Sequence, residues 1–184
     1  MNENSEERLV WIDLEMSGLN AETDVILEIA TIITDSNLNV IDHTPSMVIH
    51  QPDEMLDAMD EWNTTHHGAS GLTEAVKSSL ISLAEAEAVT LDLVSKHTVK
   101  DQSPLCGNSI WKDRVFLSKY MPVLEDYLHY RIIDVSSLKE LVRVWHPRLL
   151  DQVKQKSKRH RALDDILESI EELKYYREKL FGIN

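Results

Sequence analysis

The sequence is poor in cysteine and lacks any long apolar run. Cys106 is the single cysteine in 184 residues, which excludes a disulfide within the chain and gives no sign of an oxidising compartment. No run approaches the ~20 apolar residues of a membrane span. The first residues, MNENSEER, lack the basic start and apolar stretch of a signal peptide. We expect a soluble cytoplasmic protein with no membrane partner, in which Cys106 is a small buried residue.

Basic residues are also scarce relative to acidic ones. The chain has 19 Lys and Arg against 32 Asp and Glu, a formal net charge of -13. Proteins that grip long nucleic acids neutralise many phosphates with Lys and Arg, so a long-DNA grip is not expected. A ligand with one or two phosphates avoids most of the repulsion, although many acidic proteins bind no nucleic acid at all.

The apolar pattern predicts one α/β domain over residues 9–180, between a short polar tail at 1–8 and a C-terminal tail at 181–184. Three successive strands predict an antiparallel meander, and later strand-then-helix units predict the parallel half of a mixed sheet. The expected strands are 9–15, 25–34, 38–50, 104–108 and 131–135. The expected helices are 82–100, one carrying Asp113, one through 138–142, and a last one over 161–179.

Two acidic residues interrupt the first apolar strand, in the segment VWIDLEMSGL. Side chains two apart on a strand share a face, so Asp13 and Glu15 would lie side by side. Unpaired charges there would cost several kcal/mol, so the pair is expected to serve cations rather than to be incidental. Mg²⁺ and Mn²⁺ prefer such oxygen ligands. The alternative is a turn at the strand end with exposed acids.

Further candidates lie in NSIWKDRVFL, which contains Asp113, and in HRALDDILES, which contains His160 and Asp165. Residues five apart do not share a helix face. His160 and Asp165 therefore cannot both face the site from one helix. We expect a helix that begins near Arg161, with Asp165 pointing into the site and His160 at the N-terminal edge. Asp164 would be a first-turn acid favoured by the helix dipole. A histidine with a pKa of about 6.5 can act as the base that deprotonates water at neutral pH.

Five segments in this order resemble the oligoribonuclease family, in the DEDDh group of 3′-to-5′ exonucleases. They are WIDLEMSGL, DEWNTTHHGASGL, CGNSIWKDRVFLSKYMP, HYRIIDVSSLKEL and HRALDDILESI. The resemblance runs from about Leu9 to about Tyr176. It implies an RNase H-like fold, a mixed five-stranded sheet flanked by helices. It also implies two divalent metal ions, Mg²⁺ or Mn²⁺, held by four acids, with a histidine as general base. These are Asp13, Glu15, Asp113, Asp165 and His160.

The resemblance also implies how a short RNA is held. Leu19 would wedge between two bases, while Trp62 and His67 would contact the 3′ side of the substrate. The spacing Trp-Asn-x-x-x-His favours His67 over the adjacent His66. Without the resemblance, Trp62 would be read as a core or lid-packing residue, since an aromatic in this position needs no substrate.

At the other end of the substrate, the resemblance implies that Ser109, Arg131 and Ser136 close around a 5′ phosphate. It also implies a homodimer in which Tyr130 enters the active site of the other subunit. From the residues alone, Ser136 or Ser137 could simply cap the following helix, with Glu140 near the capping-box position.

The function expected is 3′-to-5′ hydrolysis of very short RNAs, especially diribonucleotides, to 5′-mononucleotides by a two-metal-ion mechanism. One alternative is another DEDDh exonuclease that acts on longer or structured RNA 3′ ends or on DNA. Another is a non-catalytic acidic binding module on the same fold. The stretch KQKSKRHR departs from the family in being more basic before His160. It is either a solvated charged loop or a segment that steers phosphate, and the role of His160 depends on where it lies.

Overall fold

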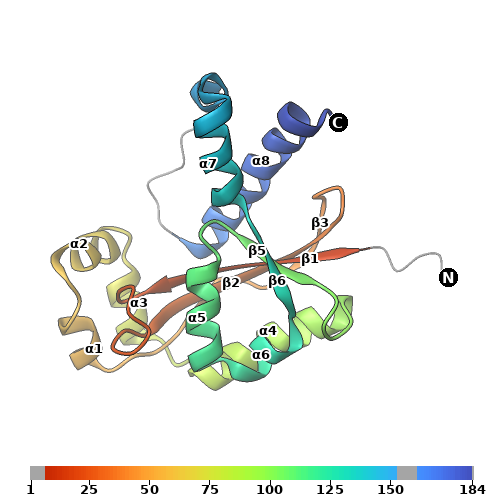
Figure 1. Cartoon of the computed structure of the whole chain (residues 1–184). Coiled ribbons are helices and arrows are strands. Elements are labelled where there is room, and N and C mark those ends of the chain that lie inside the picture. Colours follow the sequence, from red (N-terminus) through yellow and green to blue (C-terminus); the bar gives the residue numbers. More distant parts are fainter. Residues whose placement is uncertain (1–6, 153–160, 184) are drawn as a thin grey trace.

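A mixed β-sheet forms the centre of the molecule, and its middle strand carries the acidic pair (Figure 1). The computed structural model describes residues 7–152 and 161–183. The strand order is β3-β2-β1-β5-β6, and a short β4 also pairs with β2. The strands are β1 (Arg8–Met16), β2 (Ile26–Asp35), β3 (Val40–His43), β4 (Met47–Val48), β5 (Pro104–Gly107) and β6 (His129–Asp134).

Strand direction matches the predicted division of the sheet. β1, β2 and β3 pair antiparallel in succession, whereas β1 with β5 and β5 with β6 pair parallel. The meander, the parallel half and the mixed α/β sheet of five ordered strands are thereby confirmed, with the short β4 as an additional strand beside β2. β2 is buried along almost its whole length, as expected for a strand covered on both faces.

Helices cover both faces of the sheet (Figure 1). α4, α5 and α6 lie on one face, and α7 and α8 lie on the other, while α1, α2 and α3 gather at one end. The helices are α1 (Asp53–Asp57), α2 (Glu61–Ala69), α3 (Leu72–Ser78), α4 (Leu83–His97), α5 (Trp111–Tyr120), α6 (Pro122–Tyr127), α7 (Val135–Trp145) and α8 (Ala162–Phe181), with a 3₁₀ helix, η1, over Pro147–Gln152.

Alternation along β1 divides its side chains between the two cores. Ile12 and Leu14 belong to the core with Phe116 of α5, whereas Trp11 belongs to the core with Ile166 of α8. Residues at even spacing from Trp11 share its face. Asp13 and Glu15 therefore continue the face of β1 that meets α8.

The prediction of one strand over 38–50 is wrong. The segment contains β3 and β4, which are separated by residues 44–46. Pro45 has no backbone N–H for the ladder. At Thr44 the N–H still donates to the Thr31 carbonyl at 3.0 Å, but the Thr31 N–H donates to the Thr44 side-chain Oγ1 at 3.2 Å instead of to a backbone carbonyl. The short helices α1, α3 and α6 were not predicted.

Other expectations are met. The predicted helix 82–100 is α4, which starts with a capping box between Ser82 and Glu85. Cys106 is fully buried, and burial raises the pKa of its thiol, as expected for a structural residue. None of the helices in the described ranges combines the length and apolar composition of a membrane span. The cytoplasmic location stays a prediction.

Candidate active site

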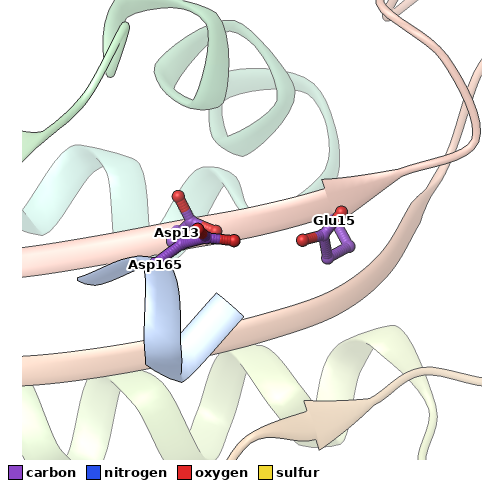
Figure 2. A group of neighbouring side chains, drawn as sticks. All are labelled: Asp13, Glu15 and Asp165. Atoms are coloured by element: carbon purple, nitrogen blue, oxygen red, sulfur yellow. The ribbon is translucent and has the colours of Figure 1, made fainter. Parts of the chain in front are cut away.

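Three carboxylates converge where β1 meets the start of α8 (Figure 2). Asp13, Glu15 and Asp165 each offer an oxygen, and these oxygens all lie within 4.8 Å of one another. In the part of the chain that the structure describes, this is the one such group of three or more metal-ligating side chains. Close carboxylate oxygens are the donors that hard divalent cations prefer, so the group can hold a metal ion.

Core packing of α8 brings Asp165 to the strand. Ala162 and Ile166 are buried in the same core as Trp11 of β1, which aligns the first turn of the helix with the acidic face. The N–H of Asp165 donates to the Arg161 carbonyl at 3.1 Å, within that first turn. Asp164 is outside the three-carboxylate group, as predicted from helix geometry.

Asp113 approaches the same strand from α5 but is not a member of the three-carboxylate group. Its side chain is buried, and its Oδ1 accepts the N–H of Leu14 at 3.0 Å. Leu14 lies between Asp13 and Glu15, so this hydrogen bond ties the fourth predicted acid to the acidic strand. Burial raises the pKa of Asp113 to about 7, although the Leu14 N–H opposes that rise.

Glu15 shows the electrostatic cost of this arrangement. The pKa of Glu15 is raised to about 8, chiefly by burial and next by the neighbouring carboxylates of Asp165, Glu28 and Asp113. The Arg161 guanidinium acts in the opposite direction. The metal-free chain therefore disfavours the charged form of Glu15, and a bound divalent cation would favour it. The residues present fit a metal site.

An ion pair between the fully buried Glu28 and the partly exposed Arg161 lies beside the carboxylates and was missed by sequence reasoning. Nε and Nη2 of Arg161 donate to Oε1 of Glu28 at 3.0 and 2.6 Å. The other oxygen, Oε2, accepts the N–H of Ala162 at 3.3 Å. Ser46 Oγ also donates to Oε1, at 2.5 Å. A glutamate inside the apolar run ILEIATIITD signals a buried charge that needs a partner, but it does not identify Arg161 as that partner.

Leu19 sits in a tightly held turn after β1. Its side chain is 66% exposed, while its carbonyl accepts from Lys112 Nζ at 3.1 Å. Asp24 closes the turn by accepting the Asn20 N–H at 2.8 Å. A Cβ at Gly18 would lie 2.4 Å from Oδ2 of Asp24, so a side chain here would displace the carboxylate that closes the turn. The turn thus presents an apolar side chain from a fixed backbone.

The adjacent histidines of α2 have different surroundings. Trp62 is 57% exposed and stacks on the ring of His66, with centroids 3.8 Å apart. His67 is buried, and its Nε2 is hydrogen bonded to the Met16 carbonyl at 2.9 Å. Its Nδ1 lies 4.0 Å from Oε2 of Glu15. His67 therefore faces the carboxylates, and the exposure of Trp62 excludes the alternative of a core position.

Two predicted phosphate ligands meet at the start of α7. The N–H of Ser109 donates to Asp134 Oδ1 and to Ser136 Oγ, each at 3.0 Å, and the two serine hydroxyls lie 3.3 Å apart. Ser109 has a φ of 52°, a left-handed conformation that is strained for a residue with a side chain. Strain of this kind is concentrated at functional sites, because surrounding structure must hold it.

The cap of α7 differs from the prediction. Asp134 is the N-cap, and its carboxylate accepts the Ser136 N–H at 2.9 Å. The expectation that Ser136 or Ser137 caps the helix is wrong, because the helix already starts at Val135 and both serines lie inside its first turn. The Ser136 hydroxyl is consequently available for other contacts.

Asn108 connects the serine pair to the carboxylate group. Its Oδ1 accepts from the Ser136 hydroxyl at 3.0 Å, and its Nδ2 donates to Ser169 Oγ at 2.6 Å. The Ser169 hydroxyl then donates to the Asp165 carbonyl at 2.7 Å. Sequence reasoning missed Asn108, because an asparagine after a strand is the ordinary composition of a turn.

Arg131 and Tyr130 lie on β6, at the edge of the sheet. Tyr130 is 71% exposed, and the Arg131 guanidinium lies 5.3 Å from the centroid of its ring. His160 lies outside the described residues, so its expected place before α8 stays a prediction. The structure thus places Asp113 and His67 beside the three clustered carboxylates, and it separately places Ser109 and Ser136 together at the start of α7.

Comparison with known proteins identifies the family. The exonuclease family model of RNase T matches residues 10–173. The oligoribonuclease of Marinobacter nauticus is 57% identical over 177 residues, covering 96% of this chain and 98% of the relative. The oligoribonuclease of Shewanella amazonensis is 55% identical over 175 residues, covering 95% and 96%.

Solved structures show the same fold. E. coli exonuclease I in complex with a dT13 oligonucleotide superposes with a TM-score of 0.71 at 18% identity, over 96% of this chain and 43% of that chain. The chain therefore spans less than half of exonuclease I, and this likeness concerns the fold alone. The family match and the near full-length identity lead to one conclusion: this chain belongs to the RNase T family of exonucleases and, within it, to the oligoribonucleases.

Proposed function

We propose that this chain hydrolyses very short RNAs, diribonucleotides above all, from the 3′ end to 5′-mononucleotides, using two divalent metal ions, Mg²⁺ or Mn²⁺. The observation that carries the proposal is the group of Asp13, Glu15 and Asp165 in a chain that matches oligoribonucleases almost from end to end. The name of these relatives describes action on short RNA, which fits the acidic balance of this chain.

Asp13, Glu15, Asp113 and Asp165 would hold the metal ions. Bound divalent ions supply a Lewis acid for water and phosphate and stabilise a departing oxygen. The carboxylate of Asp113 is held on the Leu14 N–H, so its approach to β1 is fixed before any ion binds. His160 is proposed as the general base, on the strength of the motif HRALDD.

Base contacts would come from exposed apolar side chains at the end of β1. Leu19 and Trp62 are both exposed and are carried by elements that adjoin the acidic strand, through the turn after β1 and through His67. Stacking on apolar and aromatic side chains is tolerant of base identity. His67 would act on the 3′ side of the substrate, beside Glu15.

The 5′ end of the substrate would meet Ser109, Ser136 and Arg131. Hydroxyls at a helix start and an exposed guanidinium are suited to a terminal phosphate. A closed cap at this end would exclude longer chains, which is the simplest source of a preference for two nucleotides.

A homodimer would supply Tyr130 to the partner subunit's site. Support comes from β6, the edge strand that carries Tyr130, and from the neighbouring exposed apolar side chains of α7. Exposed apolar residues beside an open strand edge are typical of surfaces that pair with another chain. The α7 residues concerned are Leu141, Val144 and Trp145.

The test is a comparison of a 5′-labelled diribonucleotide with a longer single-stranded RNA, each with Mg²⁺, Mn²⁺ or EDTA. Faster metal-dependent cleavage of the diribonucleotide supports the proposal. Equal or faster attack on the longer RNA contradicts the length preference and favours a general exonuclease. Inactivity on both RNAs with either metal contradicts catalysis on RNA.

The contribution of Tyr130 in trans can be tested by mixing two inactive variants. If the tyrosine serves the partner subunit, Tyr130→Ala mixed with Asp113→Asn creates dimers with one complete site. Random exchange of subunits would restore about a quarter of the parental activity. Mass measurements would first verify that the subunits have exchanged. If activity then did not recover, the contribution of Tyr130 across the interface would be contradicted.

A further inference from the structure

Glu28 is a fully buried carboxylate next to the metal-binding group. Its exposure is 0%, and it is the register partner of Glu15 in the antiparallel pair of β1 and β2. A buried charge is costly unless it is paired and hydrogen bonded. Glu28 meets both conditions through Arg161, Ala162 and Ser46.

Two of these three partners lie at the start of α8. Arg161 is the residue before the helix, and Ala162 is its first residue. The N–H of Ala162 is one of the helix donors that has no partner within the helix. Glu28 therefore both neutralises the residue that precedes α8 and caps the helix backbone, from a strand 133 residues earlier in the chain.

These contacts bear directly on Asp165. Asp165 follows Arg161 by one turn, and its N–H donates to the Arg161 carbonyl. The remainder of α8 is held independently by core side chains such as Ile170 and Tyr176. Loss of the Glu28 contacts would consequently loosen the first turn of α8 while leaving the rest of the helix packed.

We infer that Glu28 is a positioning residue for the metal site: by holding Arg161 and Ala162, it fixes the first turn of α8 so that Asp165 meets Asp13 and Glu15. The inference rests on the proposed metal binding.

The chain offers a matched control in a second ion pair. Nε and Nη2 of Arg114 donate to Oε1 of Glu125 at 3.0 and 2.7 Å, and both side chains are largely buried. This pair joins α5 to α6 and touches none of the three clustered carboxylates. Glu125→Gln therefore reproduces the loss of a buried ion pair without the loss of contacts to α8.

The experiment measures Mn²⁺ affinity in the absence of substrate, from the electron paramagnetic resonance signal of free Mn²⁺, together with kcat and KM for a diribonucleotide. Glu28→Gln keeps the shape of the side chain and one acceptor oxygen. We expect it to weaken Mn²⁺ binding by about 10- to 100-fold. We also expect it to lower kcat by a larger factor than the factor by which it changes KM. Glu125→Gln should leave Mn²⁺ affinity unchanged.

Variants of Arg161 provide an independent arm if Glu28→Gln does not fold. Arg161→Gln should lose Mn²⁺ affinity, and Arg161→Lys should recover part of it, because lysine restores the charge without the two-pronged geometry. The double variant Glu28→Gln/Arg161→Gln should lose no more than the worse single variant, since both act through one contact.

The possible outcomes separate the inference from the proposed function. Parental Mn²⁺ affinity in Glu28→Gln and Arg161→Gln would overturn the positioning role alone, as would an equal loss in Glu125→Gln. An unaltered chain that binds no Mn²⁺ would overturn the metal site and this inference with it.

Discussion

Glu15 and Glu28 are direct partners across the antiparallel pair of β1 and β2. Carboxylates directly opposite one another repel, so this pair of positions would weaken the sheet if nothing balanced the charge. Arg161 lies against Glu28 with its Nη2 only 2.6 Å from Oε1. The negative charge of Glu15 is expected to be balanced by bound cations. Glu28 therefore has a structural role and Glu15 a metal-binding role.

The pH dependence of stability follows from Glu15. Its pKa in the folded chain is about 8, against an ordinary value of 4.5, so between these values the folded state holds more protons than the unfolded state. Stability of the metal-free chain should therefore fall as pH rises through this window, by at most about 1.4 kcal/mol per pH unit for one proton. Urea unfolding with EDTA across the window measures the slope.

Glu15→Gln provides the comparison for that slope. Glutamine carries no titrating proton, so the variant should lose less stability than the parent over the same range of pH. Asp113, whose pKa is about 7, contributes in the same direction and leaves a residual slope. Identical slopes in the two proteins would show that Glu15 is not the group responsible.

Metal binding should stabilise the folded chain. A ligand that binds only the native state at 100 times its Kd adds about 2.7 kcal/mol. We expect Mn²⁺ to raise the melting temperature of the parent and to have little effect on Asp13→Asn, which removes one of the three clustered carboxylates. A rise of the same size in both proteins would place the bound ions elsewhere.

Asp113→Asn should separate catalysis from folding. The asparagine carbonyl can still accept the Leu14 N–H, so the fold should persist, while the loss of charge at the metal site should lower kcat by at least about 100-fold. Asp164→Asn is the matched control, because Asp164 lies outside the carboxylate group and should keep nearly parental activity. Substantial activity in Asp113→Asn would remove Asp113 from the site.

Trp62→Ala tests the base contact. A stacked base contributes about 1–3 kcal/mol, so KM for a diribonucleotide should rise roughly 10-fold or more while the melting temperature stays near that of the parent. Leu80, which is 95% exposed, gives a control in Leu80→Ala. If both variants keep the parental KM, the exposed face of Trp62 has no part in substrate binding.

Asn108 should govern recognition of the 5′ phosphate. It fixes the Ser136 hydroxyl, and a hydrogen bond is worth about 1 kcal/mol, so Asn108→Ala should reduce the preference for a 5′-phosphorylated over a 5′-hydroxyl diribonucleotide by about 5-fold. Ser169→Ala cuts the connection beyond Asn108 and should retain that preference. Steady-state kcat/KM for the two substrates checks both variants.

The local sequence pattern was sufficient to predict how the acidic residues of β1 are arranged. Residues two apart on a strand share a face, and this rule alone placed Asp13 and Glu15 together on β1. A helix start near Arg161 likewise selected Asp165 over Asp164 from helical geometry. In both cases the relevant neighbours lie within a few residues of one another, where backbone periodicity decides the outcome.

Long-range contacts were beyond the same reasoning. The pairing of Glu28 with Arg161 depends on how α8 docks on β2, which no local pattern encodes. The cap of α7 was misplaced because a start one or two residues earlier exchanges Asp134 for Ser136 as the capping residue. The strand over 38–50 was overestimated because apolar composition outweighed the single proline that interrupts it.

The burial of Asp113 beside a central strand carries an evolutionary consequence. Neutral side chains of similar shape at Asp113 or Glu15 would remove the cost of burying a charge and the repulsion between carboxylates. The metal-free fold would therefore become more stable while catalytic activity was lost. A single substitution by random drift could therefore remove catalytic activity without lowering the stability of the fold. Selection on turnover, rather than on integrity of the fold, has to keep these acids in the lineage.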